Sequence, residues 1–283
     1  EVYRKDRSWT NIVLRTSEQE APPREEQTLL NKMHRLRTVD DPERIAAYTR
    51  VAEGLLRGTP VDGDDPWTRM LVDFLMPKGK LESYDDALRH LSKFPRALKE
   101  IVQLMEAALD NIAAVPEPLI GSLSGLPLRT HARYQREELL SALGWTSNVR
   151  RPGQHREGVA WCEASNADLL LINLHKSDKD FSPTTMYRDI PVSPELFDWE
   201  SQSTTSQASP TGKRYLNQNP ASTDVVLAVR NAPEDELGTA AFTLLGTADL
   251  VSHHGDRPIQ IRWKLRRSMP PHVLSQAAAI DVG

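Results

Sequence analysis

The stretch that decides the fold of the second half of the chain reads Ile259-Gln260-Ile261-Arg262-Trp263-Lys264-Leu265-Arg266. Its apolar residues alternate with polar and charged ones, which is the pattern of a strand with one buried and one solvated face. Four other short segments rich in β-forming residues follow Gly153, at 159–163, 168–174, 224–230 and 241–245. The sequence therefore predicts a compact β-barrel or strongly bent sheet, with one or two helices, beyond residue 153.

The first third of the chain predicts helices instead. Asp41-Pro42 and Asp65-Pro66 each place an N-cap residue before a proline at the first helical position, ahead of apolar residues at helical spacing. Ser83 begins a similar segment, and a longer amphipathic stripe runs from Leu98 to Ile112. Because the apolar faces of these helices need partners, we expect a small all-α bundle.

Proline, glycine and serine dominate residues 114–130, which marks a domain boundary. The predicted fold class is therefore α+β, with an N-terminal helical bundle followed by a β domain with flanking helices. One of these flanking helices is expected at 134–143. The expected domains are a helical coupling domain at 1–115, a linker at 116–130 and the β domain at 131–283.

The composition is that of a soluble globular protein, with 39% hydrophobic and 26% charged residues among 283. The single cysteine, Cys162, excludes an internal disulfide framework and favours a reducing, cytoplasmic setting. The sequence contains neither a long apolar run for a membrane span nor a signal peptide. Because the first residue is Glu1 rather than methionine, we expect a fragment of a longer polypeptide.

The usual catalytic and cofactor motifs are absent from the sequence. It has no Gly-x-Ser-x-Gly elbow, Walker A sequence, GxGxxG, CxxC or HxxxH. We therefore expect no catalytic residue, metal site or cofactor in this chain. The formal net charge of −4 argues against a uniformly basic nucleic-acid-coating protein but leaves room for a local basic face.

Two clusters of basic residues suggest contacts with phosphates, because each phosphate contact needs a neutralising cation. The alternative is that they form solvated faces of a helix and a sheet, and the sequence favours neither interpretation. The first cluster comprises Arg129, His131, Arg133, Arg136, Arg150, Arg151, His155 and Arg156, and the second comprises His253, His254, Arg257, Arg262, Lys264, Arg266 and Arg267.

The segment from Lys179 to Gly212 combines hydroxyls, carboxylates and aromatic rings without an evident apolar periodicity, as recognition surfaces often do. Its rings are the materials of a pocket that stacks on a planar base, and a carboxylate can accept from the exocyclic amine of cytosine. The alternative is that the rings are core residues and that Asp189 caps a turn. Residues 201–212 are expected to form a long loop.

Four strings in the second half carry a family resemblance. They are Asp180-Phe-Ser-Pro-Thr-Thr-Met-Tyr-Arg-Asp189, Ser193-Pro-Glu-Leu-Phe-Asp-Trp-Glu-Ser-Gln-Ser-Thr-Thr-Ser206, Ser209-Pro-Thr-Gly212 and Val251-Ser-His-His-Gly-Asp-Arg-Pro258. They resemble a bacterial domain of unknown function that follows a phospholipase-D-type nuclease and a DEAD/DEAH-type helicase, as in SauUSI-type Type IV restriction enzymes. The resemblance covers about residues 128–271.

The resemblance implies an SRA-like domain that reads 5-methylcytosine, or a related modified cytosine, in double-stranded DNA by flipping the base. It implies that the helicase and nuclease, with their ATP and divalent metal, lie upstream in the same polypeptide and that the whole serves bacterial antiviral defence. Inside that domain the expected pocket residues are Phe181, Thr184, Thr185, Tyr187, Asp189 and Trp199. The expected DNA-backbone contacts are Arg133, Arg150, Arg151, Arg188, Lys213, Arg262, Lys264 and Arg266.

Two other hypotheses remain. The β domain could be a protein-interaction module that docks on the helicase and regulates it without reading a modified base. An intrinsic hydrolase is the third and weakest hypothesis.

Overall fold

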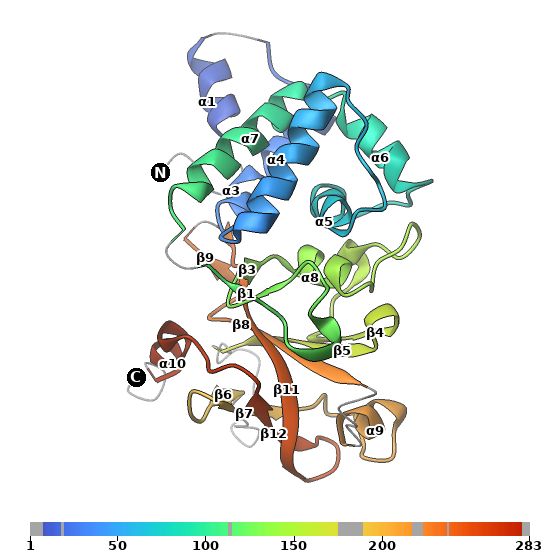
Figure 1. The fold of residues 1–283 in the computed structure, drawn as a ribbon, viewed down its shortest axis with the longest axis vertical. Coiled ribbons are helices and arrows are strands. Elements are labelled where there is room, and N and C mark those ends of the chain that lie inside the picture. Colours follow the sequence, from blue (N-terminus) through green and yellow to red (C-terminus); the bar gives the residue numbers. More distant parts are fainter. Residues whose placement is uncertain are drawn as a thin grey trace.

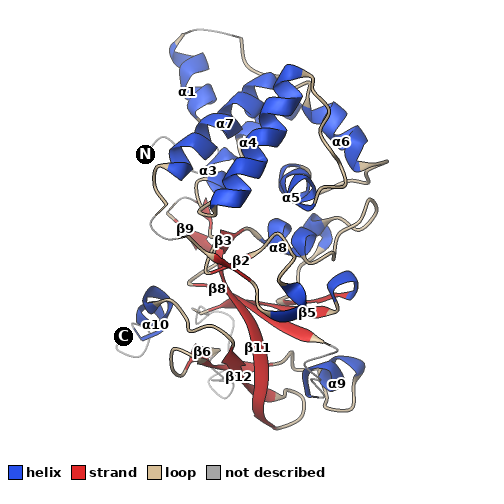
Figure 2. Cartoon of the chain, viewed as in Figure 1, coloured by secondary structure: helices blue, strands red, loops and turns tan. Residues whose placement is uncertain are grey.

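The computed structural model describes residues 8–17, 20–112, 115–174, 189–216, 223–236 and 238–278. Helices occupy one end of the molecule and a mixed sheet the other, as Figure 1 shows along the chain and Figure 2 by element type. The prediction of an α+β chain, with a helical N-terminal part followed by a bent sheet, is confirmed.

The helical part contains seven helices among the described residues. They are α1 (Trp9–Thr16), α2 (Arg24–Leu30), α3 (Met33–Leu36), α4 (Pro42–Arg57), α5 (Pro66–Leu75), α6 (Tyr84–Leu91) and α7 (Pro95–Leu109). The three predicted N-caps are confirmed, because the side chains of Asp41, Asp65 and Ser83 each accept a hydrogen bond from a first-turn N–H. None of these helices is both long and apolar enough to cross a membrane, and the same holds for every other described helix.

The sheet part begins with small elements and continues with one large sheet. Its helices are η1 (Gly121–Leu123), α8 (Arg136–Ala142), η2 (Pro152–Gln154), η3 (Glu163–Ser165), α9 (Pro210–Leu216) and α10 (Pro271–Ala278). Its strands are β1 (Glu117–Pro118), β2 (Arg129–Thr130), β3 (Arg133–Tyr134), β4 (Val159–Cys162), β5 (Ala167–Asn173), β6 (Ile190–Pro191), β7 (Leu196–Glu200), β8 (Asp224–Arg230), β9 (Glu234–Asp235), β10 (Gly238–Thr239), β11 (Phe242–His254) and β12 (Gln260–Leu265).

The large sheet has the strand order β4-β5-β8-β11-β12-β7-β6, and β3 also pairs with β11. β5 and β8 are parallel, and the other neighbours are antiparallel. The register of β11 shifts against β8 between Leu244 and Gly246, and against β12 between Leu250 and Ser252. Such irregularities bend a strand, so β11 can pair with both β8 and β12 in a curved sheet. Gly246 has φ +98°, and a Cβ there would lie 3.3 Å from the Thr130 side chain.

The sheet curls over a second core. Alternate residues of β5 and β8 point to opposite sides, so both strands are buried on both faces. One face continues the core of the helices through Leu169, Leu171, Val226 and Ala228. The other packs Leu170, Ile172, Val225 and Leu227 against Phe197, Trp199, Ile261, Trp263 and Leu265 of β7 and β12. The bend therefore brings the outer strands back onto the centre of the sheet.

The segment expected to be a linker is part of this packing. It contains β1, η1 and β2, and its Leu119, Leu123 and Leu128 are buried in the core that the helices share with the sheet. Independent folding of 1–115 and 131–283 stays a prediction.

The polar segment contains more regular structure than the sequence predicted. Residues 196–200 form β7, in which buried Phe197 and Trp199 alternate with partly exposed Leu196, Asp198 and Glu200. The expected loop is confirmed for residues 201–209 but not for 210–212, because α9 begins at Pro210. Both features follow from local rules, since the alternation has the period of a strand and proline is favoured at the first position of a helix.

Candidate nucleic-acid interface

The hairpin of β11 and β12 ends in a turn to which a distant segment is attached. The Ser201 N–H donates to the Ile259 carbonyl at 2.9 Å, and the Ser201 hydroxyl accepts from the Ile259 N–H at the same distance. Gln207 donates its backbone N–H to Asp256 Oδ1 at 2.6 Å and its side-chain amide to the Gly255 carbonyl at 2.8 Å. The Ser/Thr-rich segment is therefore fixed against the turn.

Asp189 is hydrogen-bonded to the last residue of β7, just before Ser201. Its Oδ1 accepts the Glu200 N–H at 3.0 Å, and the residue is 8% exposed. Parts of all four strings that carry the family resemblance thus meet at one end of the sheet. We call residues 189, 200–212 and 251–259 the hairpin-turn site.

Exposed groups that suit contacts with phosphates lie in the hairpin-turn site and on the neighbouring elements α9 and β12. His253, His254 and Arg257 are exposed in the turn, and Lys213 is exposed on α9, which packs against β11. Lys264 is exposed on the outer side of β12. Within the described chain, neither lysine has an ion-pair partner, so both can take a phosphate without losing a carboxylate.

The other predicted cations of β12 and its C-terminal end are already paired. Arg262 Nη2 lies 2.6 Å from Asp198 Oδ2 across the β7–β12 ladder. Arg266 binds Asp249 at 2.7 Å and Asp224 at 3.0 Å. These pairs neutralise much of the predicted second basic cluster, so its contribution to the surface potential is smaller than the sequence suggested.

Trp199 does not lie where a base could stack on it. It is 6% exposed and packs edge to face on Tyr215 with a ring-centroid distance of 5.4 Å. The prediction that Trp199 contacts a flipped base is therefore wrong in this conformation, and its role is that of a core residue. Four other predicted pocket residues and one backbone contact, namely Phe181, Thr184, Thr185, Tyr187 and Arg188, lie outside the described residues.

Arginines of the first basic cluster hold the sheet part on the helices. Arg151 is fully buried, and its Nη2 lies 2.6 Å from Asp73 Oδ1 of α5, so the prediction that it contacts DNA is wrong. Arg133 is exposed but pairs with Asp40 at 2.8 Å. Arg150 is exposed, and its guanidinium lies 4.9 Å from the Trp145 ring centroid. Arg133 and Arg150 remain accessible to a ligand.

The centre of this helix–sheet junction is Arg44 of α4, which is fully buried. It donates to Glu138 Oε1 at 3.1 Å and to the Arg133 carbonyl at 2.7 Å, and it stacks on Tyr134 with 4.0 Å to the ring centroid. The Tyr48 hydroxyl donates to the same Glu138 oxygen at 2.7 Å. Burial disfavours the charge of Arg44, but Glu138, with smaller contributions from Tyr134, Tyr48 and Asp40, outweighs it, and together they raise the arginine pKa. Arg44 is thus charged, and its role is structural.

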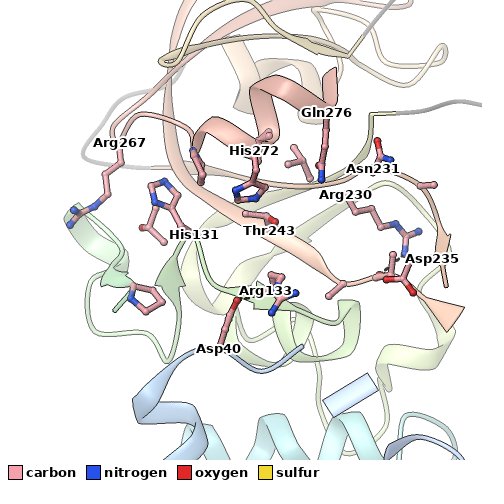
Figure 3. A pocket seen from close by; sticks show the side chains of 18 of the residues that line it. Asp40, His131, Arg133, Arg230, Asn231, Asp235, Thr243, Arg267, His272 and Gln276 are labelled. Atoms are coloured by element: carbon pink, nitrogen blue, oxygen red, sulfur yellow. Dashed lines mark hydrogen bonds and ion pairs between the residues drawn. The ribbon is translucent and has the colours of Figure 1, made fainter. Parts of the chain in front are cut away.

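A polar cleft of about 1230 Å³ opens beside the junction, at the opposite end of β11 from the hairpin turn (Figure 3). It lies between the helical part, the 115–133 segment, the 229–243 segment and α10. Basic and acidic side chains line it together, among them His131, Arg133, Arg230, Arg267, His272, Asp40 and Asp235. The cleft can therefore hold a polar ligand better than an apolar one.

His131 stands in a constrained position in this cleft. Its φ of +73° is in the left-handed region, and its N–H donates to the Leu244 carbonyl at 2.6 Å. Burial lowers the pKa of its imidazole, nearby His272 lowers it further, and a hydrogen bond to the Ser268 backbone opposes both. The ring is consequently neutral near pH 7.

Cys162 is fully buried in β4, and burial raises the pKa of its thiol to about 12. It is thus a neutral core residue. In the described ranges, no three His, Cys, Asp or Glu side chains are grouped so that they could hold a metal ion.

Neither the polar cleft nor Arg230 was predicted from the sequence. Arg230 is the last residue of a correctly predicted strand, and a charge at the end of a buried apolar run is the signal that could have singled it out. The partners that define the cleft come from segments far apart in the chain, which a pattern of neighbours cannot reveal.

Comparison with known proteins identifies a family. No curated protein matches this chain. The crystal structure of SUVH6 from Arabidopsis thaliana in complex with SAM is similar, with 10% sequence identity and a TM-score of 0.33; the match covers 84% of this chain and 42% of the SUVH6 chain. The chain thus spans less than half the length of that structure. Residues 128–277, more than half of the chain, match the domain of unknown function DUF3427, and the chain belongs to this family.

Proposed function

We propose that this chain is a DNA-recognition module that reads 5-methylcytosine, or a related modified cytosine, by base flipping. The observation that carries the proposal is the meeting of three distant motif segments at the hairpin-turn site. Flipping a base costs a few kcal/mol of stacking, which contacts with the base and its flanking phosphates must recover. Exposed Lys213, Lys264, His253 and His254 supply candidate phosphate contacts around that site.

We further propose that the module serves a modification-dependent, SauUSI-type Type IV restriction enzyme. The family resemblance motivates this context, in which an upstream helicase and nuclease supply the ATP- and metal-dependent chemistry. The helical part would then couple recognition to the helicase. In this proposal the chain does not itself cut DNA, and incubation with a methylated plasmid and Mg²⁺ should leave the plasmid intact.

The test is the affinity of this chain for matched duplexes with and without 5-methylcytosine, measured by fluorescence anisotropy at several salt concentrations. Tighter binding to the modified duplex is expected. Equal affinities would contradict the modified-base proposal, and binding that does not depend on salt would contradict DNA binding altogether.

A pair of lysine variants locates the interface. Lys213→Ala should weaken binding to both duplexes and reduce the salt slope by about 1, because one phosphate contact is lost. Lys99→Ala removes the same charge from an exposed position on α7 and should change neither quantity. Equal effects of the two variants would exclude the hairpin-turn site as the interface.

A protein-interaction module is the second candidate function, and the ion pairing of Arg262 and Arg266 favours it. Cations already neutralised by Asp198, Asp224 and Asp249 are less available to phosphates. This alternative predicts that Arg262→Ala leaves DNA affinity unchanged while weakening association with the helicase.

A further inference from the structure

Arg230 is a buried cation that forms no ion pair with a carboxylate among the described residues. It is 9% exposed at the end of β8, and its guanidinium lies 4.3 Å from the Phe242 ring centroid. Its Nε donates to Asn173 Oδ1 at 2.7 Å and its Nη1 to the Ala240 carbonyl at 3.2 Å. No described residue accepts from Nη2. A buried guanidinium held only by neutral groups is costly unless an anion compensates its charge.

Arg230 lines a small cavity of about 290 Å³, and two further arginines line it as well. Arg35 comes from α3, and Arg136 is the first residue of α8. Arg35 is paired with Glu137 at 2.7 Å. Arg136 donates to the His155 carbonyl at 3.3 Å, whereas its Nε is buried without a hydrogen-bond partner. Two of the three guanidiniums therefore have no ion-pair partner in the described part of the chain.

Burial and the neighbouring arginines both lower the pKa values of Arg230 and Arg136. Burial, followed by the charges of Arg136 and Arg35, lowers the pKa of Arg230 to about 10, and Glu137 only partly opposes them. Burial, followed by Arg156 and Arg35, also lowers the pKa of Arg136. Both groups remain protonated near pH 7, so the cavity keeps an excess of positive charge.

The cavity adjoins the polar cleft. Arg230 and Glu234 line both, so a ligand bound between the arginines can continue into the larger space. The small cavity lies at the lower end of the usual size for ligand sites, about 300–1,000 Å³. The small cavity suits a single tetrahedral anion, and the polar cleft has room for a larger group bonded to that anion.

We propose that Arg35, Arg136 and Arg230 form a phosphate-binding pocket between the helical part and the sheet. Arginine binds phosphate through charge-assisted and often bidentate hydrogen bonds, and the guanidinium groups of Arg136 and Arg230, which line the cavity, provide the donors. The phosphate belongs either to a free or terminal nucleotide or to a nucleic-acid backbone that passes through the cleft. This inference does not rest on modified-base recognition, because the pocket lies at the opposite end of β11 from the hairpin-turn site.

The test uses the whole chain with inorganic phosphate as the first probe. At constant ionic strength set with chloride, phosphate should raise the melting temperature of the wild-type protein by about 2 °C. Isothermal titration should show that Arg230→Gln weakens phosphate at least about tenfold, as expected for the loss of a charge-assisted hydrogen bond. Arg136→Gln should weaken it in the same direction.

Two variants distinguish a specific loss of phosphate binding from a loss caused by damage to the fold. Arg57→Gln removes an exposed arginine from α4 and should bind phosphate as the wild type does. Glu234→Gln removes an exposed carboxylate from the rim and should tighten binding, which misfolding cannot produce. No binding by the wild type, or the same affinity in Arg230→Gln and Arg57→Gln, would overturn the proposal.

Two more probes identify the source of the phosphate. Binding of dCMP that depends on Arg230, without binding of an oligonucleotide that has 5′- and 3′-hydroxyl ends, assigns the pocket to a free or terminal phosphate. Binding of that oligonucleotide with the same dependence on Arg230 assigns it to the backbone. Absence of phosphate binding by the wild-type protein, together with intact discrimination of 5-methylcytosine, would contradict this pocket and leave the proposed function standing.

Discussion

Two arginine–aspartate pairs have the same N–O distance of 2.6 Å and different consequences. Arg151 and Asp73, at the helix–sheet junction, have fully buried side chains. Arg262 and Asp198, on the outer side of the sheet, have side chains that are 41% and 35% exposed. Water screens the outer pair and competes for its hydrogen bonds, whereas the inner pair has no such alternative. Burial, and not distance, decides which pair the fold depends on.

The comparison extends to the regions around the two pairs. At the junction, Asp73 also accepts from the Thr146 hydroxyl at 2.6 Å, and Arg151 donates to the Met76 carbonyl at 2.8 Å. Each member is thus part of a hydrogen-bonded network that joins the two parts of the chain. On the outer face, the pair lies on the surface of one ladder, where a ligand can displace one partner.

The largest expected effect comes from breaking the inner pair. Asp73→Ala leaves the Arg151 guanidinium buried without its carboxylate, and should lower the free energy of unfolding by about 3–5 kcal/mol. Urea denaturation followed by circular dichroism measures the change. Glu53→Ala, which breaks the exposed Arg57–Glu53 pair on α4, is the matched control and should leave the urea midpoint within error. Equal shifts for the two variants would contradict the distinction between buried and exposed pairs.

A smaller effect should follow acidification, through His155 at the junction. Its ring packs edge to face on Trp145 with 5.1 Å between centroids, and its Nε2 lies 3.0 Å from the Val159 carbonyl. Burial lowers its pKa below the usual value of about 6.5, the hydrogen bond to Val159 opposes this, and Arg136 lowers the pKa further. The unfolded chain therefore binds the proton more readily than the folded one.

The sign of the pH dependence follows from that lowered pKa. The contribution of His155 is fully present above about pH 6.5 and is lost as the pH falls through the folded-state value. His155→Gln should make the fall in stability between pH 7.5 and 5 shallower, because the titrating group is removed. Any packing loss in this variant is independent of pH, so the difference between the two pH values isolates the titration. An unchanged slope would contradict a lowered pKa.

The smallest effect on stability is expected on the outer face. Arg262→Ala removes a guanidinium from a solvated pair, and the urea midpoint should stay within error of the wild type. The anisotropy titrations with DNA then become informative, because the protein remains folded. A marked loss of stability would show that the outer pair is as structural as the inner one.

Local rules predicted much of the architecture. Asp41, Asp65 and Ser83 mark helix starts because a side-chain oxygen and the first-turn N–H groups lie within a few residues of each other. The strand predicted at 224–230 agrees with β8 at both ends, since an uninterrupted apolar run between turns is typical of a strand that is buried on both faces. The sheet beyond residue 153 was predicted for the same reason.

The candidate sites were predicted less well, and the reason is physical. Arg151 and Arg262 are both arginines in basic clusters, and the sequence assigned both to DNA. One meets a buried carboxylate of α5 and the other an exposed carboxylate of β7, and neither partner is near it in the sequence. Trp199 was assigned to a base pocket because its neighbours are polar, although every second residue around it faces the core.

The sequence by itself determined the helix starts, the central strands, the order of a helical part and a sheet, and the motifs of the DUF3427 family. These depend on interactions between residues close together in the chain. Only the tertiary structure decided which arginines are used inside the fold, which motif segments meet at the hairpin turn, and where Arg35, Arg136 and Arg230 come together. The solvation and pairing of a charge depend on surroundings contributed by distant segments, and folding alone brings those segments to it.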